Sequence, residues 1–105
     1  MSHVFVGDLA AEVEVPQNGT LSRVLAKEGP LRLVAFAFDR GQELTEHTAT
    51  VPVVIQVVSG SVTVEVAEER HHLTPRSWLY LGAGEAHSVF ADEPARLLLT
   101  MIRPA

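Results

Sequence analysis

The sequence predicts a single all-β domain, and three observations lead to this fold class. First, a chain of 105 residues is long enough for one compact hydrophobic core and too short for two. Second, 47% of the residues are apolar but only 6% are aromatic, so the core is built mainly from the branched aliphatic side chains that favour strands. Third, turn-forming pairs such as Asn18-Gly19 and Ser59-Gly60 divide the chain into short segments. We therefore expect one domain over residues 1–105.

Five short segments have the composition of buried or half-buried strands. They are rich in Val, Leu, Ile and aromatic residues and are bounded by turn residues. Within one of them, Val62 and Val64 alternate with Thr63 and Glu65, as expected for a strand with one buried face. Residues 20–27 fit either a strand or a short helix. The predicted strands are residues 31–39, 53–59, 61–67, 78–81 and 95–102.

The turns between these segments indicate how the strands connect. The Ser59-Gly60 pair predicts a tight hairpin between two of the strands, because glycine adopts a positive φ at little cost. Residues 67–70 are expected to close the next hairpin. Many short strands at regular spacing are typical of a sandwich or barrel, in which closure protects the sheet edges.

Charge and hydropathy exclude several function classes. The chain carries 13 acidic and 8 basic residues, a net charge of −5, and the basic residues are scattered singly, so we expect no nucleic-acid binding. No apolar run approaches the roughly 20 residues of a membrane-spanning helix, so we expect no membrane partner. The first four residues lack the layout of a signal peptide and the chain has no cysteine, which predicts a cytoplasmic location.

Residues 41–60 resemble the first sequence motif of the cupin superfamily. In that motif a glycine is followed after five residues by His-x-His, then by a glutamate, and finally by a closing glycine. Gly41, His47 and Gly60 match these positions in register. Ala49 stands where the second histidine would be, and Val53 stands where the glutamate would be.

Residues 76–91 resemble the second cupin motif, whose fixed positions are Gly, Pro-x-Gly, His and Asn. Gly84 and His87 match, whereas Arg76, Gly82 and Ala91 replace the first glycine, the proline and the asparagine. The order and spacing of the two segments agree with the strands predicted independently. The resemblance implies a small cupin, that is, a double-stranded β-helix or jelly-roll barrel with both segments lining its lumen.

The resemblance also implies that His47 and His87 are the two remaining metal ligands of the family's site. Strand alternation predicts that His47, Ala49, Val53 and Ile55 face the lumen, so that together with His87 they line the pocket. Two imidazoles fall short of the roughly three protein ligands of a catalytic metal, so a divalent metal would be held weakly. Alternatively, the ring nitrogens bond to each other, to water or to backbone carbonyls. Candidates for a third metal donor are Glu43, Glu46, Gln56, His71 and His72.

Three functions fit these residues. The first is a barrel that binds a small organic molecule in its lumen, with at most a weak divalent-metal site. The second is a metal-dependent cupin enzyme, an oxygenase, isomerase or decarboxylase, acting on a small organic substrate. The third is a non-catalytic sensor or interaction dimer. Small cupins commonly pair through their outer faces, so we expect a homodimer, with the aromatic pair Trp78 and Tyr80 or the pair Phe36 and Phe38 as anchors.

Overall fold

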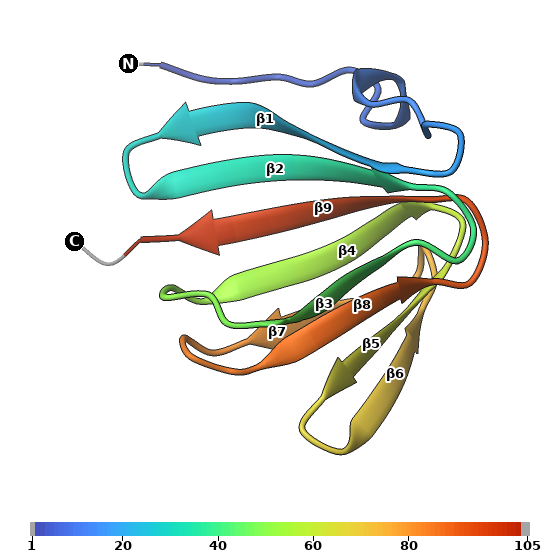
Figure 1. The fold of residues 1–105 in the computed structure, drawn as a ribbon. Coiled ribbons are helices and arrows are strands. Elements are labelled where there is room, and N and C mark those ends of the chain that lie inside the picture. The colour runs from blue at the N-terminus through green and yellow to red at the C-terminus, as the bar shows by residue number, and fades with distance from the viewer. Residues whose placement is uncertain (1, 104–105) are drawn as a thin grey trace.

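The computed structural model describes residues 2–103 and consists of two antiparallel sheets packed face to face (Figure 1). The prediction of an all-β fold is confirmed, since these residues form nine strands and only one helical turn, η1 (Ala10–Glu12). Within this range no helix is long and apolar enough to cross a membrane. The outermost residues of the expected domain, Met1, Pro104 and Ala105, lie outside the described residues.

Each sheet combines one pair of consecutive strands with strands that are distant in sequence. The larger sheet contains, in spatial order, β1 (Thr20–Glu28), β2 (Leu31–Phe38), β9 (Ala95–Ile102), β4 (Val53–Ser59) and β7 (Leu79–Leu81). The smaller sheet contains β3 (Glu43–His47), β8 (His87–Ala91), β5 (Val62–Val66) and β6 (Glu69–Leu73). All five predicted strands form, and the segment that fitted either a strand or a helix is strand β1.

The predicted hairpin at Ser59-Gly60 is wrong. Strand β4 pairs with β7 and β9, whereas β5 pairs with β6 and β8, so the chain passes from one sheet to the other at this point. Gly60 has a φ of +76°, and a Cβ atom there would overlap the carbonyl oxygen of Pro94 and lie 2.9 Å from the Cα atom of Ala95. Glycine is needed at this corner because another part of the backbone approaches it closely. The next predicted hairpin does form, between β5 and β6.

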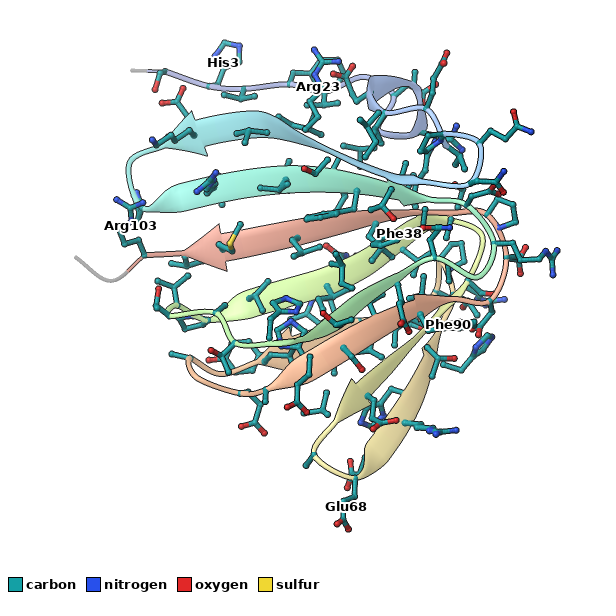
Figure 2. The ribbon with its side chains drawn as sticks, viewed as in Figure 1. His3, Arg23, Phe38, Glu68, Phe90 and Arg103 are labelled. Carbon is teal, nitrogen blue, oxygen red and sulfur yellow. The ribbon has the colours of Figure 1, made fainter. Side chains whose placement is uncertain are left out.

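Alternate residues of the strands fill the space between the two sheets. On β4, Val53, Ile55 and Val57 all point inwards and are at most 5% exposed. Phe38 at the end of β2 is fully buried (Figure 2). Burial of each such side chain contributes roughly 1.5–3 kcal/mol to stability, so the aliphatic core is the main support of the fold. The buried core residues are Phe38, Val53, Ile55, Val57, Val62, Val64, Leu73, Leu81, Val89, Ala91, Ala95 and Leu97.

A second, smaller core forms on the outer face of the larger sheet. The segment before β1 folds back over this face, so that Val13 packs with Ala35, Ala37 and Leu98. The guanidinium of Arg96 donates a 2.7 Å hydrogen bond from Nε to the carbonyl oxygen of Val13. The N-terminal segment is therefore part of the folded domain, and it covers apolar side chains on the outer face of the larger sheet.

The aromatic side chains proposed as dimer anchors fall into two classes. Trp78 and Tyr80 lie on the outer surface, 64% and 53% exposed, with stacked rings whose centroids are 6.5 Å apart. Phe38 is fully buried and Phe36 packs against the core, because both face inwards on β2. The hypothesis that Phe36 and Phe38 anchor a dimer is therefore wrong, whereas a homodimer anchored by Trp78 and Tyr80 stays a prediction.

Candidate functional site

The two histidines are direct neighbours across the smaller sheet. Strand β3 pairs with β8 in a register that places His47 opposite His87. Their ring centroids are 4.3 Å apart, with the ring planes tilted by 57°. Opposite residues in an antiparallel pair point to the same face. His87 is 2% exposed, whereas His47 lies at the exposed end of β3, so the pair connects the interior with the barrel opening.

A β-bulge in β3 brings His47 to the inner face. Leu44 pairs with Val89 and His47 with His87, so two residues of β3 lie opposite the single residue Ser88. In a regular strand, residues three apart would point to opposite faces. Here Leu44 packs against the core and His47 lines a cavity on the same side. The position of His47 therefore depends on the bulge.

Backbone hydrogen bonds determine which nitrogen of each ring is free. The Nδ1 atom of His47 lies 2.9 Å from the carbonyl oxygen of Thr45, and that of His87 lies 3.0 Å from the carbonyl oxygen of Glu85. A carbonyl oxygen only accepts hydrogen bonds, so Nδ1 is the donor in both rings. In the neutral imidazoles the lone pair is then on Nε2, and neither Nε2 atom has a hydrogen-bond partner within residues 2–103. Both rings offer an acceptor to a bound molecule.

The histidines line a mainly apolar cavity of about 310 Å³ between the sheets. This volume lies at the lower end of the range typical of small-molecule sites. Of the residues predicted to line the pocket, His47, Ala49, Val53 and His87 border this cavity, whereas Ile55 is fully buried in the core and does not. Among the described residues, the wall consists of Ser22, Val24, Arg32, Val34, Phe36, His47, Ala49, Val53, His87, Leu99 and Met101.

The predicted third donors do not border this cavity. Gln56 is exposed on the outer face of β4, opposite Leu98 of β9. His71 and His72 lie on strand β6, where their rings are close to other side chains: Nε2 of His71 is 3.3 Å from Glu69, and Nδ1 of His72 is 3.1 Å from Asp92. Glu43 and Glu46 are exposed on β3.

The donor set therefore does not fit a resident catalytic metal. Between residues 2 and 103, no group of three or more His, Cys, Asp or Glu side chains is arranged to hold a metal ion. The side-chain donors at the cavity that such an ion prefers are the two imidazoles of His47 and His87. A catalytic metal usually has about three protein ligands, and the two imidazoles fall short of this number.

The sequence analysis missed seven of the eleven wall residues. Arg32, Val34 and Phe36 of β2 line the cavity. On the paired strand β9, Met101 and Leu99 line it too, whereas Leu97, opposite Phe36, does not. The available signal was the alternation in residues 31–38, which places an arginine on the same face as three apolar side chains. That signal indicates which residues share a face, but it does not identify which face is the lumen.

Solved structures, among them two described as cupins, have the same architecture. A conserved protein of unknown function from Streptococcus pyogenes is 28% identical, with a TM-score of 0.87, and the match covers 100% of this chain and 92% of that one. A cupin superfamily protein from Desulfitobacterium hafniense is 18% identical, with a TM-score of 0.87 and coverage of 99% and 95%. An RmlC-like cupin protein from Desulfovibrio desulfuricans is 20% identical, with a TM-score of 0.85 and coverage of 98% and 100%.

These likenesses confirm the resemblance seen in the two sequence motifs. The chain has the fold of the cupin superfamily, and His47 and His87 lie together at its opening, where the two motif segments meet. No family model and no curated protein matches the chain. Sequence identity at this level supports the same fold but does not assign a particular activity.

Proposed function

We propose that this protein binds a small organic molecule in the barrel cavity, through apolar contacts and one or two hydrogen bonds to the histidines. The single observation that carries this proposal is the pair of imidazoles at one side of a mainly apolar cavity of about 310 Å³. The Nδ1 atoms of His47 and His87 are held by backbone carbonyls, so their Nε2 atoms are acceptors for a hydroxyl or amine group.

The cavity wall favours a ligand with a substantial apolar part. Val34, Phe36 and Leu99 line it, and covering such surface is worth roughly 25 cal/mol for each Å² removed from water. A polar group on the ligand would complete the hydrogen bonding of His87, which is otherwise nearly enclosed by the protein. Affinity would come from the apolar part and orientation from the imidazoles.

The other two candidate functions have less support. A metal-dependent oxygenase, isomerase or decarboxylase needs a donor beyond the two imidazoles, and any divalent metal at the pair would be weakly bound. If metal analysis of protein purified without chelator found one tightly held ion per chain, this part of the proposal would be wrong. A sensor or interaction dimer would use the outer face at Trp78 and Tyr80, and the cavity would then be incidental.

Methyl NMR with a library of small hydroxylated and aminated aromatic compounds tests the proposal. Binders should shift the methyl signals of Val53 and Leu99, which line the cavity. The His87→Phe variant keeps an aromatic ring but removes the acceptor, so it should weaken these binders roughly five- to tenfold. The control is His72→Phe, since His72 is exposed on β6 and lies outside the cavity. Equal loss in both variants would exclude the histidine pair as the binding group.

A further inference from the structure

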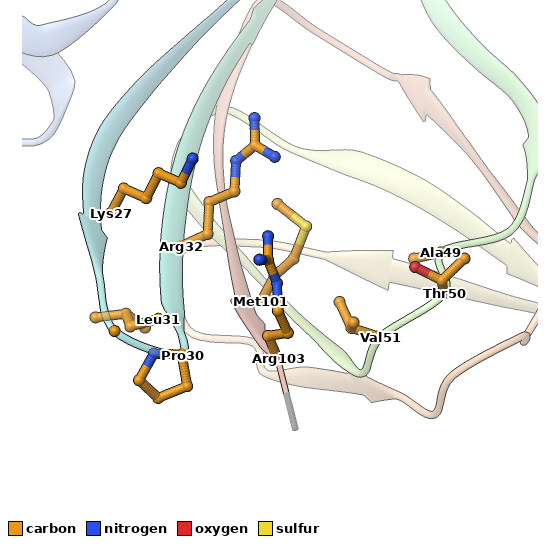
Figure 3. Close-up of a pocket in the computed structure, with 10 residues that line it drawn as sticks. Lys27, Pro30, Leu31, Arg32, Ala49, Thr50, Val51, Met101 and Arg103 are labelled. Atoms are coloured by element: carbon orange, nitrogen blue, oxygen red, sulfur yellow. The ribbon is translucent and has the colours of Figure 1, made fainter. Parts of the chain in front are cut away.

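Three cationic side chains gather at the open end of the barrel, beside the histidine cavity. Lys27, Arg32 and Arg103 border an outer cavity of about 250 Å³ (Figure 3). Arg32, Ala49 and Met101 border both this outer cavity and the inner one, so the two adjoin each other. Of the residues that the structure describes, no acidic one borders either cavity. Three of the eight basic residues of a chain with a net charge of −5 therefore lie at this end.

A β-bulge in β1 turns Lys27 towards this rim. Val24 pairs with Val34, Ala26 with Leu33, and Lys27 with Arg32. Leu25 is the extra residue of the bulge, and it shifts the alternation of β1 by one. Without this shift, Lys27 would face the opposite side of the sheet. The bulge therefore places two cations directly opposite each other on the inner face.

Backbone contacts bring Arg103 to the same place. Its N–H donates a 2.8 Å hydrogen bond to the carbonyl oxygen of Pro30 in the turn between β1 and β2. Two residues earlier, Met101 pairs with Arg32 across β9 and β2. In Figure 3, Arg103 lies beside Met101, with Arg32 and Lys27 on the two neighbouring strands.

Among the described residues, the three cations have no carboxylate partner. Like charges placed directly opposite each other on adjacent strands destabilise a sheet. Within residues 2–103 none of the three forms an ion pair with a carboxylate, in contrast to Arg23 with Glu12 and Arg70 with Glu65. A bound anion would offset this repulsion, because it would accept charge-assisted hydrogen bonds from several of these groups at once.

We propose that Lys27, Arg32 and Arg103 form an anion subsite, and that the molecule held in the cavity carries a carboxylate or phosphate at one end. This inference rests on the proposed function and narrows it to a small organic anion with an apolar body. Arg32 borders both cavities, so an anionic group at the rim and an apolar body against Val34 and Leu99 belong to one extended site.

NMR titrations at low ionic strength test the subsite with four probes: inorganic phosphate, phenyl phosphate, benzoate and phenol. Phenyl phosphate or benzoate should bind the wild-type protein at least about tenfold more tightly than phenol, since a hydrogen bond to a charged group contributes roughly 1.5–3 kcal/mol. The comparison of phenyl phosphate with benzoate decides which anion the rim favours. Inorganic phosphate alone should shift the amide signals of Gly29 and Arg103.

The matched variants are Arg32→Gln and Arg76→Gln, which remove the same charge at two places. Arg32→Gln should reduce the advantage of the anionic probes over phenol about tenfold. Arg76 is exposed and borders neither cavity, so Arg76→Gln should change nothing. If phenol binds in the cavity and the anionic probes bind no tighter, or if both variants lose affinity equally, the subsite is refuted.

The same titrations separate failure of the subsite from failure of the proposed function. If phenyl phosphate, benzoate and phenol all leave the methyl signals of Val53 and Leu99 unmoved, the proposed cavity function fails. In that case, if inorganic phosphate still shifts the amide signals of Gly29 and Arg103 in the wild type but not in Arg32→Gln, the anion subsite remains supported without the cavity function. If phenol binds in the cavity as tightly as the anions do, the cavity function stands and the subsite falls.

Discussion

The two ends of the barrel differ in what fills the space between the sheets. At the end where Gly60 forms the corner, the space is filled by Phe38, Val62, Ala91 and Ala95, which are fully buried. At the opposite end, where the β1–β2 turn lies (Figure 1), two adjoining cavities are bordered by imidazoles and cations. We call the first the closed end and the second the open end. The closed end contributes most of the stability of the fold, so the open end can hold polar groups, whose burial in the core would be costly.

Connections that cross between strands reinforce the closed end. The backbone of Ala91 accepts a hydrogen bond from Gly41 and donates one to Gln42, each 2.9 Å long. The hydroxyl of Ser61 donates a 2.8 Å hydrogen bond to Glu93. At the open end, the 2.8 Å hydrogen bond from the Gly84 N–H to the Ala49 carbonyl oxygen joins the two loops beside the histidines. We therefore expect substitutions at the closed end to affect stability and those at the open end to affect binding.

The largest expected effect is that of Phe38→Ala. This side chain is fully buried at the closed end, so its removal should lower the free energy of unfolding by roughly 3–5 kcal/mol. Phe90 is 43% exposed on β8, and Phe90→Ala should cost less than about 1 kcal/mol. Urea unfolding followed by circular dichroism measures both. Equal losses would show that burial at the closed end is not what supports the fold.

Gly60→Ala should destabilise the protein by roughly 3 kcal/mol, because the new Cβ atom would overlap the carbonyl oxygen of Pro94. The control is Gly84→Ala at the open end. Gly84 also has a positive φ, of +82°, but nothing lies within 4 Å of a Cβ atom there. Only the backbone strain remains, so the cost should be roughly 1 kcal/mol. Thermal and urea unfolding of both variants give the difference, and a Gly84 variant as unstable as the Gly60 variant would contradict it.

Ala49→His should turn the histidine pair, which we expect to bind a metal only weakly, into a tighter metal site. Ala49 borders the same cavity as His47 and His87, so the new imidazole would be a third donor. Four ligands supply roughly 10–16 kcal/mol to a structural zinc site, so one ligand is worth about 3 kcal/mol, or about a hundredfold in affinity. Calorimetric titration with Zn²⁺ measures the gain. The control is Thr50→His, since Thr50 borders only the outer cavity, and an equal gain there would argue against the geometry.

Trp78→Ser tests whether the outer surface forms a homodimer interface. If Trp78 and Tyr80 anchor a homodimer, removing the larger ring should weaken self-association at least about tenfold, as expected for a central aromatic residue. Analytical ultracentrifugation over a range of concentrations measures the change. Phe90→Ser removes another exposed aromatic side chain, from the smaller sheet, and should leave self-association unchanged. A wild-type protein that is monomeric throughout would exclude the dimer.

The smallest effect concerns Asp39, in the loop after β2. Hydrogen bonds from the backbone N–H groups of Asn18, at 2.7 Å, and Arg40, at 2.8 Å, hold the pKa of its carboxyl below the ordinary value of 3.8. The folded state therefore favours the ionised form, and this stabilisation is present above the unfolded pKa and is lost as pH falls through the folded pKa.

The Asp39→Asn variant should accordingly be slightly less stable than the wild type near about pH 6, and the difference should shrink as pH falls below 3.8. Unfolding curves at a series of pH values measure this trend. A difference that is constant with pH would mean that the charge of Asp39 contributes nothing.

Much of the fold was predictable because it depends on local patterns. The alternation of apolar residues and the turn pairs located all five expected strands, and the motif positions of Gly41, His47, Gly60, Gly84 and His87 indicated the cupin barrel. Those motifs also led to a pocket prediction that named His47, Ala49, Val53 and His87, which border one cavity. The remaining member, Ile55, is buried in the core because the cavity does not extend that far along β4.

What the sequence by itself determined is which residues favour strands and which of them share a face along a regular stretch. The tertiary structure alone decided three things: the change of sheet at Gly60, the bulge that turns His47 inwards, and the bulge that places Lys27 opposite Arg32. The physical reason is that the pairing of each strand with its neighbours sets these features, and one extra residue opposite a partner strand reverses the alternation on which sequence interpretation depends.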